Sequence, residues 1–156
     1  MTPDQLIATA LVKRAMIATA ESCTGGMVAA AITDISGSSA VFDRGFVTYS
    51  NAAKTQMLGV PPNLLETHGA VSEEVARAMA QGALAHSGAT LAVSITGIAG
   101  PSGGSATKPV GLVHFACATK TGLYWHERMV FNGDRANIRL AARDHALQML
   151  GKALAG

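Results

Sequence analysis

Three segments of this 156-residue chain gather small polar residues or glycine at places where a ligand could bind: Glu21–Gly26, Ser50–Lys54 and Thr96–Pro109. Each follows a short segment whose apolar pattern predicts a β-strand. In an open α/β sheet, ligands bind beyond the carboxyl ends of the strands. If the three strands run parallel, the three loops converge on one crevice, and that crevice is the predicted site.

The first of these loops lies between a predicted strand and a predicted helix. Backbone N–H groups at a helix start attract an anion or a developing oxyanion, and Gly25 and Gly26 let a ligand approach the backbone closely. The alternative is an ordinary helix cap formed by Ser22 or Thr24. Cys23 is a second candidate nucleophile, although no histidine nearby in the sequence could activate it.

The second loop contains Asn51 and Lys54, and Tyr49 directly precedes it. A lysine in the first turn of a helix lies near the positive end of the helix dipole, which disfavours its charged form. Partial burial would lower its pKa further and make it a usable base. The tyrosine at the strand end could donate or relay a proton. The alternative is an exposed lysine beside a half-buried tyrosine, with no chemical role.

The third loop is long and glycine-rich, and loops of this kind are usually functional or mobile. We expect Thr96, Gly97 and Gly100 to line the crevice. Neither the phosphate-loop spacing Gly-x4-Gly-Lys nor a Gly-x-Gly-x-x-Gly pattern at the first strand is present, which argues against a dinucleotide fold. Arg135, at the start of the last predicted helix, could bind a phosphate. Alternatively, it shares a solvated basic face with Arg139.

Metal, cofactor and nucleic-acid sites are not predicted. The two cysteines lie far apart, and the five histidines form no His-x-His or His-x3-His pair: His68, His86, His114, His126 and His145. The formal net charge of +2 gives no basic stripe for nucleic acid. No apolar run has the length of a membrane span, and the N-terminus has no signal-peptide layout. These patterns predict a cytoplasmic protein without a nucleic-acid or membrane partner.

The predicted strands alternate with helices, which is typical of an α/β domain. Apolar runs and turn signals predict strands at 16–20, 42–50, 90–95, 110–119 and 123–131, and helices at 3–15, 27–35, 52–58, 61–68, 72–87 and 134–155. Lys120-Thr121-Gly122 predicts a hairpin between the last two strands. The expected fold is a single domain over residues 1–156, with a mixed, mostly parallel sheet of about five strands covered on both faces.

Six motifs occur in one order and together resemble the CinA (competence-damage-inducible) C-terminal domain family, the nicotinamide-nucleotide amidohydrolases. They are Ala20–Gly26, Gly45–Asn51 with Lys54, His68–Ser72, Ser94–Pro101, Lys108–Gly111 and Gly133–Arg135. The resemblance implies a three-layer α/β/α fold. It also implies conversion of nicotinamide mononucleotide to nicotinate mononucleotide and ammonia, in the recycling of pyridine nucleotides. The N-terminal pyrophosphatase domain of many relatives is not among these residues, so its activity is not expected here.

The resemblance places the family's catalytic serine at Ser22 and its tyrosine and lysine partners at Tyr49 and Lys54. Ser22 would attack the carboxamide after losing its proton to neutral Lys54, and backbone N–H groups from Thr24 to Gly26 would receive the oxyanion. Tyr49 would relay a proton to the departing ammonia. The competing hypothesis is a non-catalytic nucleotide-binding or regulatory module. A DNA-uptake or repair factor fits the near-neutral charge poorly, and a homo-oligomer is compatible with the sequence.

Overall fold

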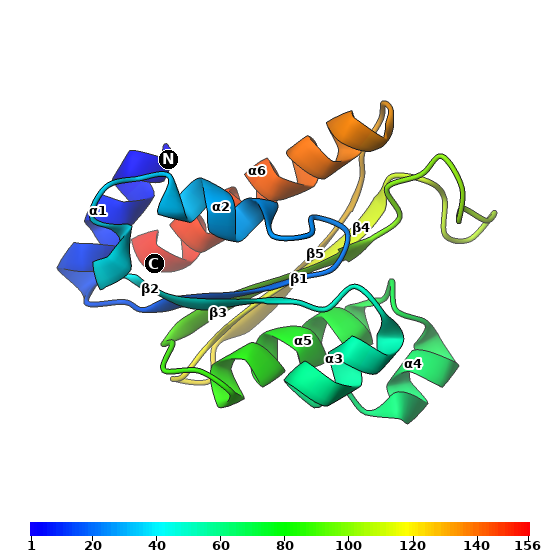
Figure 1. Ribbon diagram of the computed structural model, residues 1–156, viewed down its shortest axis with the longest axis horizontal. Helices are drawn as coiled ribbons and strands as arrows, with labels where there is room; N and C mark the ends of the chain where they lie inside the picture. The colour runs from blue at the N-terminus through cyan, green and yellow to red at the C-terminus, as the bar shows by residue number, and fades with distance from the viewer.

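The computed structural model describes all 156 residues and has one five-stranded sheet covered by helices on both faces (Figure 1). In chain order, the elements are α1 (Pro3–Lys13), β1 (Ile17–Glu21), α2 (Met27–Thr33), the 3₁₀ helix η1 (Ser38–Ala40), β2 (Phe42–Val47), α3 (Asn51–Leu58), α4 (Pro62–His68), α5 (Glu73–Ala85), β3 (Leu91–Gly97), β4 (Leu112–Thr119), β5 (Tyr124–Val130) and α6 (Arg135–Ala155).

The strand order across the sheet is β2-β1-β3-β4-β5. β1 pairs in parallel with both β2 and β3, while β4 is antiparallel to β3 and to β5. Four strands therefore run in one direction and β4 alone runs against them, which confirms the predicted mixed sheet. The predicted hairpin joins β4 to β5, and Gly122 in its turn has a φ of +95° that favours glycine.

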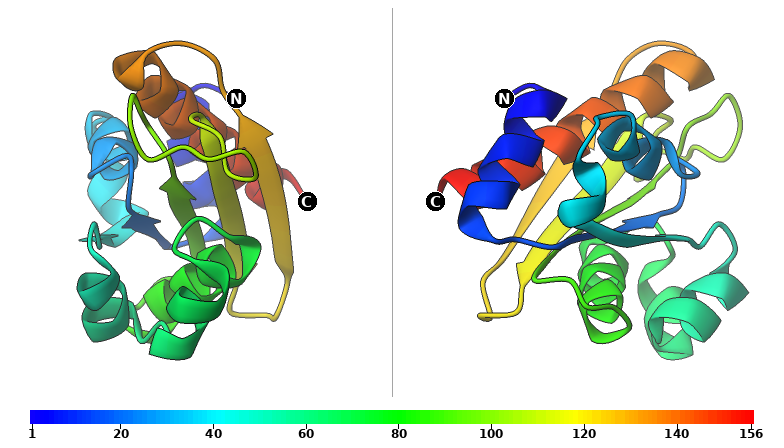
Figure 2. Two further views of the ribbon diagram at one scale, coloured as in Figure 1. Left: turned by 90° about the vertical axis from the view of Figure 1, so that its right-hand side faces the viewer. Right: turned by 60° about the vertical axis from the view of Figure 1, so that its left-hand side comes forward.

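The helices form two layers, with α1, α2 and α6 on one face of the sheet and α3, α4 and α5 on the other (Figures 1 and 2). A cluster of 19 buried apolar residues fills the first side, including Leu6, Ile32 and Met149. A cluster of 11 fills the second, including Leu58 and Met79. The three-layer α/β/α architecture implied by the resemblance is thus confirmed.

The second layer packs closely because small residues face it. Ala18, Ala20 and Ala92 of the central strands belong to its core and are fully buried. A Cβ at Gly82 of α5 would lie 2.0 Å from the carbonyl oxygen of Leu58, so α3 and α5 can approach this closely only with glycine there. This contact holds α3, the helix of Lys54, against α5, which itself packs on the sheet.

Some predicted boundaries of strands and helices differ from the observed ones near the candidate site. β2 ends at Val47, three residues earlier than predicted, and Ser50 caps α3 by accepting a hydrogen bond from the N–H of Ala53 at 3.0 Å. α2 starts at the predicted Met27 but is only seven residues long. The 3₁₀ helix η1 was not predicted. The residues after β2 thus belong to a loop, and Tyr49 lies in it.

Candidate active site

The three loops predicted to converge do so beyond the carboxyl ends of the parallel strands β1, β2 and β3. They enclose a cavity of about 230 Å³, and the α4–α5 connection and the start of α6 complete its wall. The lining residues are Ser22, Cys23, Tyr49, Asn51, Lys54, Ala70, Val71, Thr96, Gly97, Ala99 and Arg135. Seven of the eleven predicted site residues therefore lie in one cavity. The other four, Thr24, Gly25, Gly26 and Gly100, lie in the adjoining loops.

Lys54 of α3 is buried at the base of this cavity, with only 1% of its surface exposed. Its Nζ donates hydrogen bonds to Oγ of Ser22 at 3.0 Å and to the carbonyl oxygens of Thr48 and Tyr49 at 2.9 and 3.2 Å. The predicted alternative of an exposed lysine is wrong. Burial lowers the pKa of Lys54 below its ordinary value of 10.5, and the neighbouring Cys23 thiol opposes that shift.

The three partners of Lys54 suit a group that changes its protonation state. An ammonium group has three N–H donors and no acceptor, whereas a neutral amine has two N–H donors and a lone pair. Two N–H groups can remain on the carbonyls of Thr48 and Tyr49 in both states. The third position of the nitrogen faces the Ser22 hydroxyl, and in the neutral amine it can accept the hydroxyl proton.

Ser22 follows β1 directly and is 8% exposed. Its backbone N–H donates to the carbonyl oxygen of Ile95 at 2.9 Å, which ties it to β3. The alternative role of Ser22 as a helix cap is wrong. The N-cap position of α2 is Gly26, and no side chain forms a capping hydrogen bond there. The hydroxyl of Thr24 is buried without a hydrogen-bond partner, so Thr24 is no cap either.

Cys23 lines the cavity beside Ser22 but does not have the properties of an activated nucleophile. It is 6% exposed, and burial raises the pKa of its thiol to about 11. The thiolate is the reactive form of cysteine, and a raised pKa keeps the thiol protonated at neutral pH. The serine is the better-placed nucleophile of the two, since it is the one that contacts Lys54.

Glu21, which sequence reasoning missed, is a fully buried carboxylate that caps α2. Its Oε1 accepts hydrogen bonds from the N–H groups of Gly26 and Val28 at 3.2 and 2.9 Å, and Oε2 accepts one from Ala29 at 3.0 Å. The signal in the sequence was a carboxylate at the end of an apolar strand, directly before a glycine pair. Glu21 thereby occupies the anion-binding helix start that was expected to serve a ligand.

The predicted oxyanion donors therefore need correction. The N–H of Gly25 donates to the carbonyl oxygen of Ser22 at 3.0 Å, and that of Gly26 is held by Glu21. The N–H groups of Cys23 and Thr24 form no hydrogen bond to another residue. Thr24 is fully buried and does not line the cavity, so none of the predicted stretch from Thr24 to Gly26 offers an N–H there. The N–H of Cys23, a lining residue, is the available donor.

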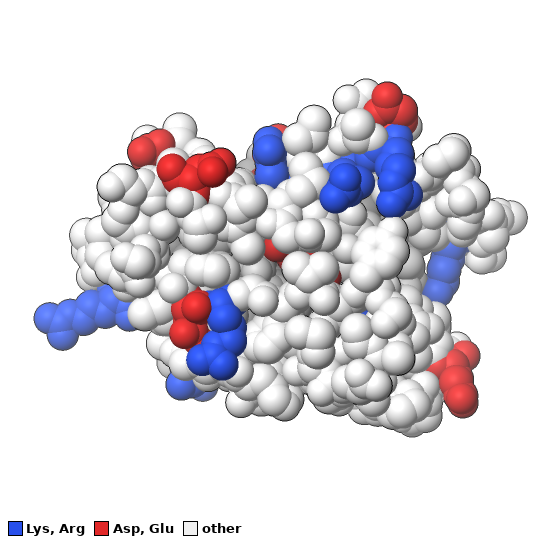
Figure 3. Space-filling model, viewed as in Figure 1, with Lys and Arg blue, Asp and Glu red and all other residues white.

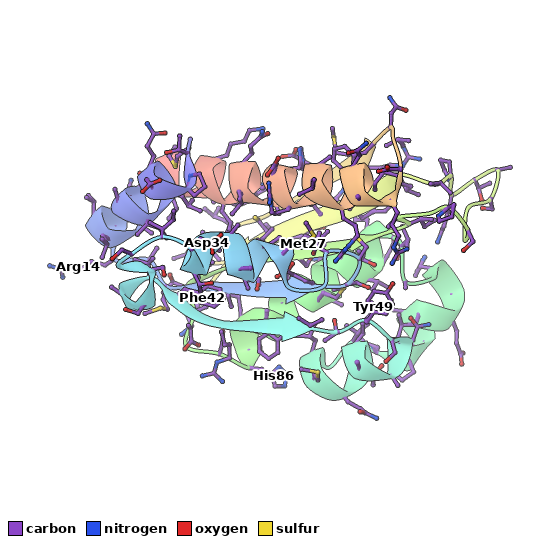
Figure 4. The ribbon with its side chains drawn as sticks, turned by 45° about the horizontal axis from the view of Figure 1, so that its top comes forward. Arg14, Met27, Asp34, Phe42, Tyr49 and His86 are labelled. Atoms are coloured by element: carbon purple, nitrogen blue, oxygen red, sulfur yellow. The ribbon has the colours of Figure 1, made fainter.

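Tyr49 lies beyond the end of β2, between that strand and α3 (Figure 4). It is 63% exposed, so its side chain is more open than the half-buried position considered above. Arg135 bridges two loops of the cavity: Nη2 donates to the Tyr49 hydroxyl oxygen at 3.1 Å, and Nη1 donates to the carbonyl oxygen of Gly100 at 2.9 Å. Gly100 does not line the cavity; its carbonyl oxygen instead holds the Arg135 side chain in place.

The remaining predicted residues have positions that explain their type. Asn51 is the first residue of α3 and lines the cavity. Oγ1 of Thr96 donates to the carbonyl oxygen of Ala70 at 2.8 Å and so fastens β3 to the α4–α5 connection. A Cβ at Gly97 would lie 2.6 Å from the Val113 side chain, which makes glycine necessary there for strand packing.

The two arginines at the start of α6 both contact the loops of the candidate site, but Arg135 is exposed to solvent whereas Arg139 is half-buried. Nε of Arg139 donates to the carbonyl oxygen of Cys23 at 3.0 Å, and Arg135 makes the contacts described above. On the face drawn in Figure 3, Lys and Arg form small separate groups, one of them over the start of α6.

His114 and His126 form a hydrogen-bonded pair at 2.8 Å, and no group of three or more His, Cys, Asp or Glu could hold a metal. None of the helices could cross a membrane by length and apolarity.

Comparison with known proteins places this chain in one family. The CinA C-terminal domain model matches residues 2–154. The chain belongs to the CinA C-terminal domain family. It is 60% identical over 129 residues to the nicotinamide-nucleotide amidohydrolase PncC of Enterobacter agglomerans, covering 83% of this chain and 79% of that protein.

Two further relatives differ in length. A putative competence-damage inducible protein of Symbiobacterium thermophilum is 51% identical across 99% of this chain, which spans only 38% of that longer protein. The crystal structure of a competence/damage inducible protein from Agrobacterium tumefaciens matches with a TM-score of 0.92 and 51% identity, covering 99% of this chain and 96% of that one. The fold described above is therefore the fold of the family.

Proposed function

We propose that this chain is a nicotinamide-nucleotide amidohydrolase that converts nicotinamide mononucleotide and water to nicotinate mononucleotide and ammonia. The observation that carries the proposal is the 3.0 Å contact between Nζ of buried Lys54 and Oγ of Ser22 at the base of the cavity. The 60% identity to a protein named for this activity supports the choice of substrate.

The first step uses the Ser22–Lys54 pair. A carboxamide is a weak electrophile, so the hydroxyl oxygen must become a stronger nucleophile as it attacks. Lys54, as a neutral amine, takes the hydroxyl proton while Oγ of Ser22 forms a bond to the amide carbon. The lowered pKa of Lys54 supports this role, because burial disfavours the ammonium form that could not accept a proton.

The amide oxygen becomes an oxyanion when the carbon turns tetrahedral. The N–H of Cys23 has no hydrogen-bond partner and its residue lines the cavity beside Ser22, so we assign the oxyanion to it. Preorganised backbone donors at such a position are usually among the largest contributions to an acyl-transfer rate. Gly25 and Gly26 keep this turn in a conformation that other residues rarely adopt, with φ of +58° and +109°.

The tetrahedral intermediate collapses when the C–N bond breaks. The leaving nitrogen needs a proton to depart as ammonia. Protonated Lys54 supplies it, directly or relayed by the Tyr49 hydroxyl, and becomes a neutral amine again. Neutral Lys54 then takes a proton from the water that attacks the ester on Ser22, and it returns that proton to Oγ of Ser22 when the ester C–O bond breaks. The acid formed loses its proton to solvent. The carboxylate product leaves, and the serine and lysine regain their starting protonation states.

The nucleotide end of the substrate needs a cation at the cavity wall. Arg135 provides a guanidinium whose present partners, the Tyr49 hydroxyl and the Gly100 carbonyl, are both neutral. A phosphate is a better acceptor for a guanidinium than either of these, because both groups are charged and the contact can be bidentate. We therefore assign the phosphate to Arg135, with Asn51, Thr96 and Gly97 lining the remaining cavity. In this role the enzyme would act in the cytoplasm, recycling pyridine nucleotides.

The direct test is turnover of nicotinamide mononucleotide by the purified protein, followed as nicotinate mononucleotide by chromatography and as ammonia by a coupled assay. The Lys54→Met variant is the control for a contaminating amidase. Product from the wild-type protein and none from the variant supports the proposal. Binding of the mononucleotide by calorimetry without product would instead make the chain a nucleotide-binding module.

A further inference from the structure

The cavity around Ser22 is lined by basic side chains and by no carboxylate. Lys54 and Arg135 are the basic residues of its lining, and neither takes part in an ion pair of the fold. The nearest carboxylate in the chain, Glu21, is fully buried and accepts three backbone N–H groups at the start of α2. The cavity therefore offers no counter-ion to a positively charged ligand.

The contacts of Lys54 suit an ammonium, although no charge stabilises one. Nζ donates to three uncharged oxygens, which are Oγ of Ser22 and the carbonyl oxygens of Thr48 and Tyr49. Burial disfavours the charged form and lowers the pKa of Lys54. The neighbouring Cys23 thiol opposes this shift, but its own pKa is raised to about 11, so it is uncharged at neutral pH. The protonation state of Lys54 therefore depends on the charge of whatever enters the cavity.

The other elements around the cavity add positive charge or none. From α6, Arg135 donates to the Tyr49 hydroxyl, and Arg139 donates to the carbonyl oxygen of Cys23. β3, the loop after it and the α4–α5 connection contribute neutral residues to the lining: Ala70, Val71, Thr96, Gly97 and Ala99. A cation that enters the cavity thus meets no anion that would cancel its effect on Lys54.

Nicotinamide mononucleotide would bring a permanent cation into this cavity. Its ring nitrogen bears the ribose, is positively charged and lies meta to the carboxamide. The amide carbon must reach Oγ of Ser22, which is 3.0 Å from Nζ of Lys54, so the ring charge comes close to Nζ as well. At an effective dielectric constant of about 20, a unit positive charge about 6 Å away lowers the pKa of a lysine by about two units.

We infer that the substrate's own pyridinium charge activates Lys54: its entry into a cavity without a carboxylate displaces the proton from Nζ, and the general base forms in the Michaelis complex. The inference rests on the proposed function of the Ser22 site. The displaced proton goes to solvent, and the freed amine then takes the proton of the Ser22 hydroxyl. The cationic ring is thereby a determinant of specificity, because a neutral carboxamide of the same shape would leave the proton on Lys54.

This activation predicts two separate acidic limbs in the kinetics of the wild-type protein. The limb of kcat/KM reports Lys54 in the free protein, and the limb of kcat reports it in the Michaelis complex. Because the substrate cation favours the neutral amine, the kcat limb should lie about one to two pH units below the kcat/KM limb. Coincident limbs, or a kcat limb at the higher pH, overturn the inference.

Calorimetry on Ser22→Ala measures the same displacement without turnover. The probes are nicotinamide mononucleotide and its 1,4-dihydro form, which has the same phosphate and carboxamide but an uncharged ring. Titrations at a pH between the two limbs, in two buffers of different ionisation enthalpy, give the protons released on binding. We expect the pyridinium form to release about one proton more than the dihydro form, since it favours the unprotonated lysine.

The matched control is Ser22→Ala combined with Lys54→Met, which removes the titrating amine and leaves Arg135 in place. The difference in proton release between the two nucleotides should vanish in this double variant. Equal release from both nucleotides on Ser22→Ala, or a difference that persists in the double variant, overturns the inference. If Ser22→Ala does not fold, the wild-type pH profiles decide.

Failure of the proposed function would give a different result. A wild-type protein that binds nicotinamide mononucleotide without turnover would refute the proposed function, and its proton release would still test the effect of the ring charge on Lys54. Failure to bind either nucleotide would overturn both.

Discussion

Nζ of Lys54 lies 3.0 Å from Oγ of Ser22, although 32 positions separate the two residues in the chain. Ser22 follows β1 and Lys54 lies in the first turn of α3 after β2, and these two strands are parallel neighbours. Parallel neighbours bring their carboxyl ends to the same edge of the sheet. The sheet topology thus builds the pair, and burial gives the lysine the lowered pKa that a base requires.

Replacing Ser22 by alanine should abolish turnover and leave the fold intact. Loss of a nucleophile that acts together with a base typically costs on the order of 10⁴-fold or more in rate. The folded protein loses one hydrogen bond, from Lys54, which is a change of about 1 kcal/mol in stability. Steady-state kinetics and a thermal melt measure the two effects on the same sample.

The matched control is Cys23→Ala, one position further on. Its thiol is buried and protonated, and we expect this variant to keep turnover within about tenfold of the wild type. An active Ser22→Ala protein beside an inactive Cys23→Ala protein would reverse the assignment and make the cysteine the nucleophile.

Lys54→Met and Lys54→Arg should both fail, for different reasons. Methionine is similar in length but has no basic nitrogen, and arginine stays protonated and cannot accept the serine proton. Loss of a general base typically costs about 10² to 10⁴-fold, and we expect both variants to fall in that range. Turnover should be measured beside nicotinamide mononucleotide binding by calorimetry, which the methionine variant should retain. A largely active arginine variant would show that Lys54 only contributes charge.

The pH dependence follows from the same residue. Burial lowers the pKa of Lys54, and the active form is the neutral amine. The rate kcat/KM should therefore rise with pH as Lys54 loses its proton, with a midpoint below the ordinary lysine value of 10.5. A profile that falls over this range would contradict a lysine base.

Much of the fold could be predicted from the sequence because local patterns agree with it. The buried strands are short apolar runs, and Thr2, Ser50, Ser72 and Asp134 each cap a helix with their own side chain. The convergence of the three loops followed from the parallel topology alone. The strand order and the face that each helix covers required the structure.

The parts of the site that escaped prediction depend on distant contacts. Arg139 reaches Cys23 across more than a hundred positions, and no spacing in the sequence reports such a contact. Glu21 was overlooked because a carboxylate is rarely buried without a partner, and its partners here are backbone N–H groups that carry no sequence signal. Ala70 and Val71 line the cavity only because β3 holds their connection through Thr96.

Chelators should leave the activity intact. The proposed chemistry uses Ser22, Lys54 and backbone N–H groups, and no group of three or more candidate ligands lies in the fold. We expect unchanged turnover after dialysis against EDTA. If EDTA abolished the activity and a divalent cation restored it, the reaction would need a metal ion, and this result would contradict the proposed mechanism.

Arg135→Gln should discriminate between substrates with and without a phosphate. If Arg135 binds the phosphate, KM for nicotinamide mononucleotide should rise by about 10 to 100-fold, the scale of a charge-assisted hydrogen bond. Activity toward nicotinamide riboside should change little. The control is Arg143→Gln, whose arginine does not line the cavity. Equal losses on both substrates would mean that Arg135 acts through its contacts with Tyr49 and Gly100.

His114 should make the folded state sensitive to acid. Its Nδ1 lies 2.8 Å from Nε2 of His126 on the neighbouring strand β5. The pKa of His114 is lowered from 6.5 to about 4. Burial is the main cause of this lowered pKa, followed by electrostatic repulsion from His126, Arg128 and Lys108. The Glu74 carboxylate acts in the opposite direction and raises the pKa. The native protein therefore disfavours the proton that the unfolded chain accepts readily.

The sign of the effect is fixed by which state holds more protons. Between pH 6.5 and about 4 the unfolded chain binds a proton at His114 and the folded protein does not, so stability falls as the pH falls through this window. His114→Asn cannot titrate and should lose less stability between about pH 7 and about pH 4.5 than the wild type does, as measured by urea melts. The exposed Thr107→Asn serves as the control and should follow the wild type. An equal acid response in wild type and His114→Asn would show that His114 titrates alike in the folded and unfolded states.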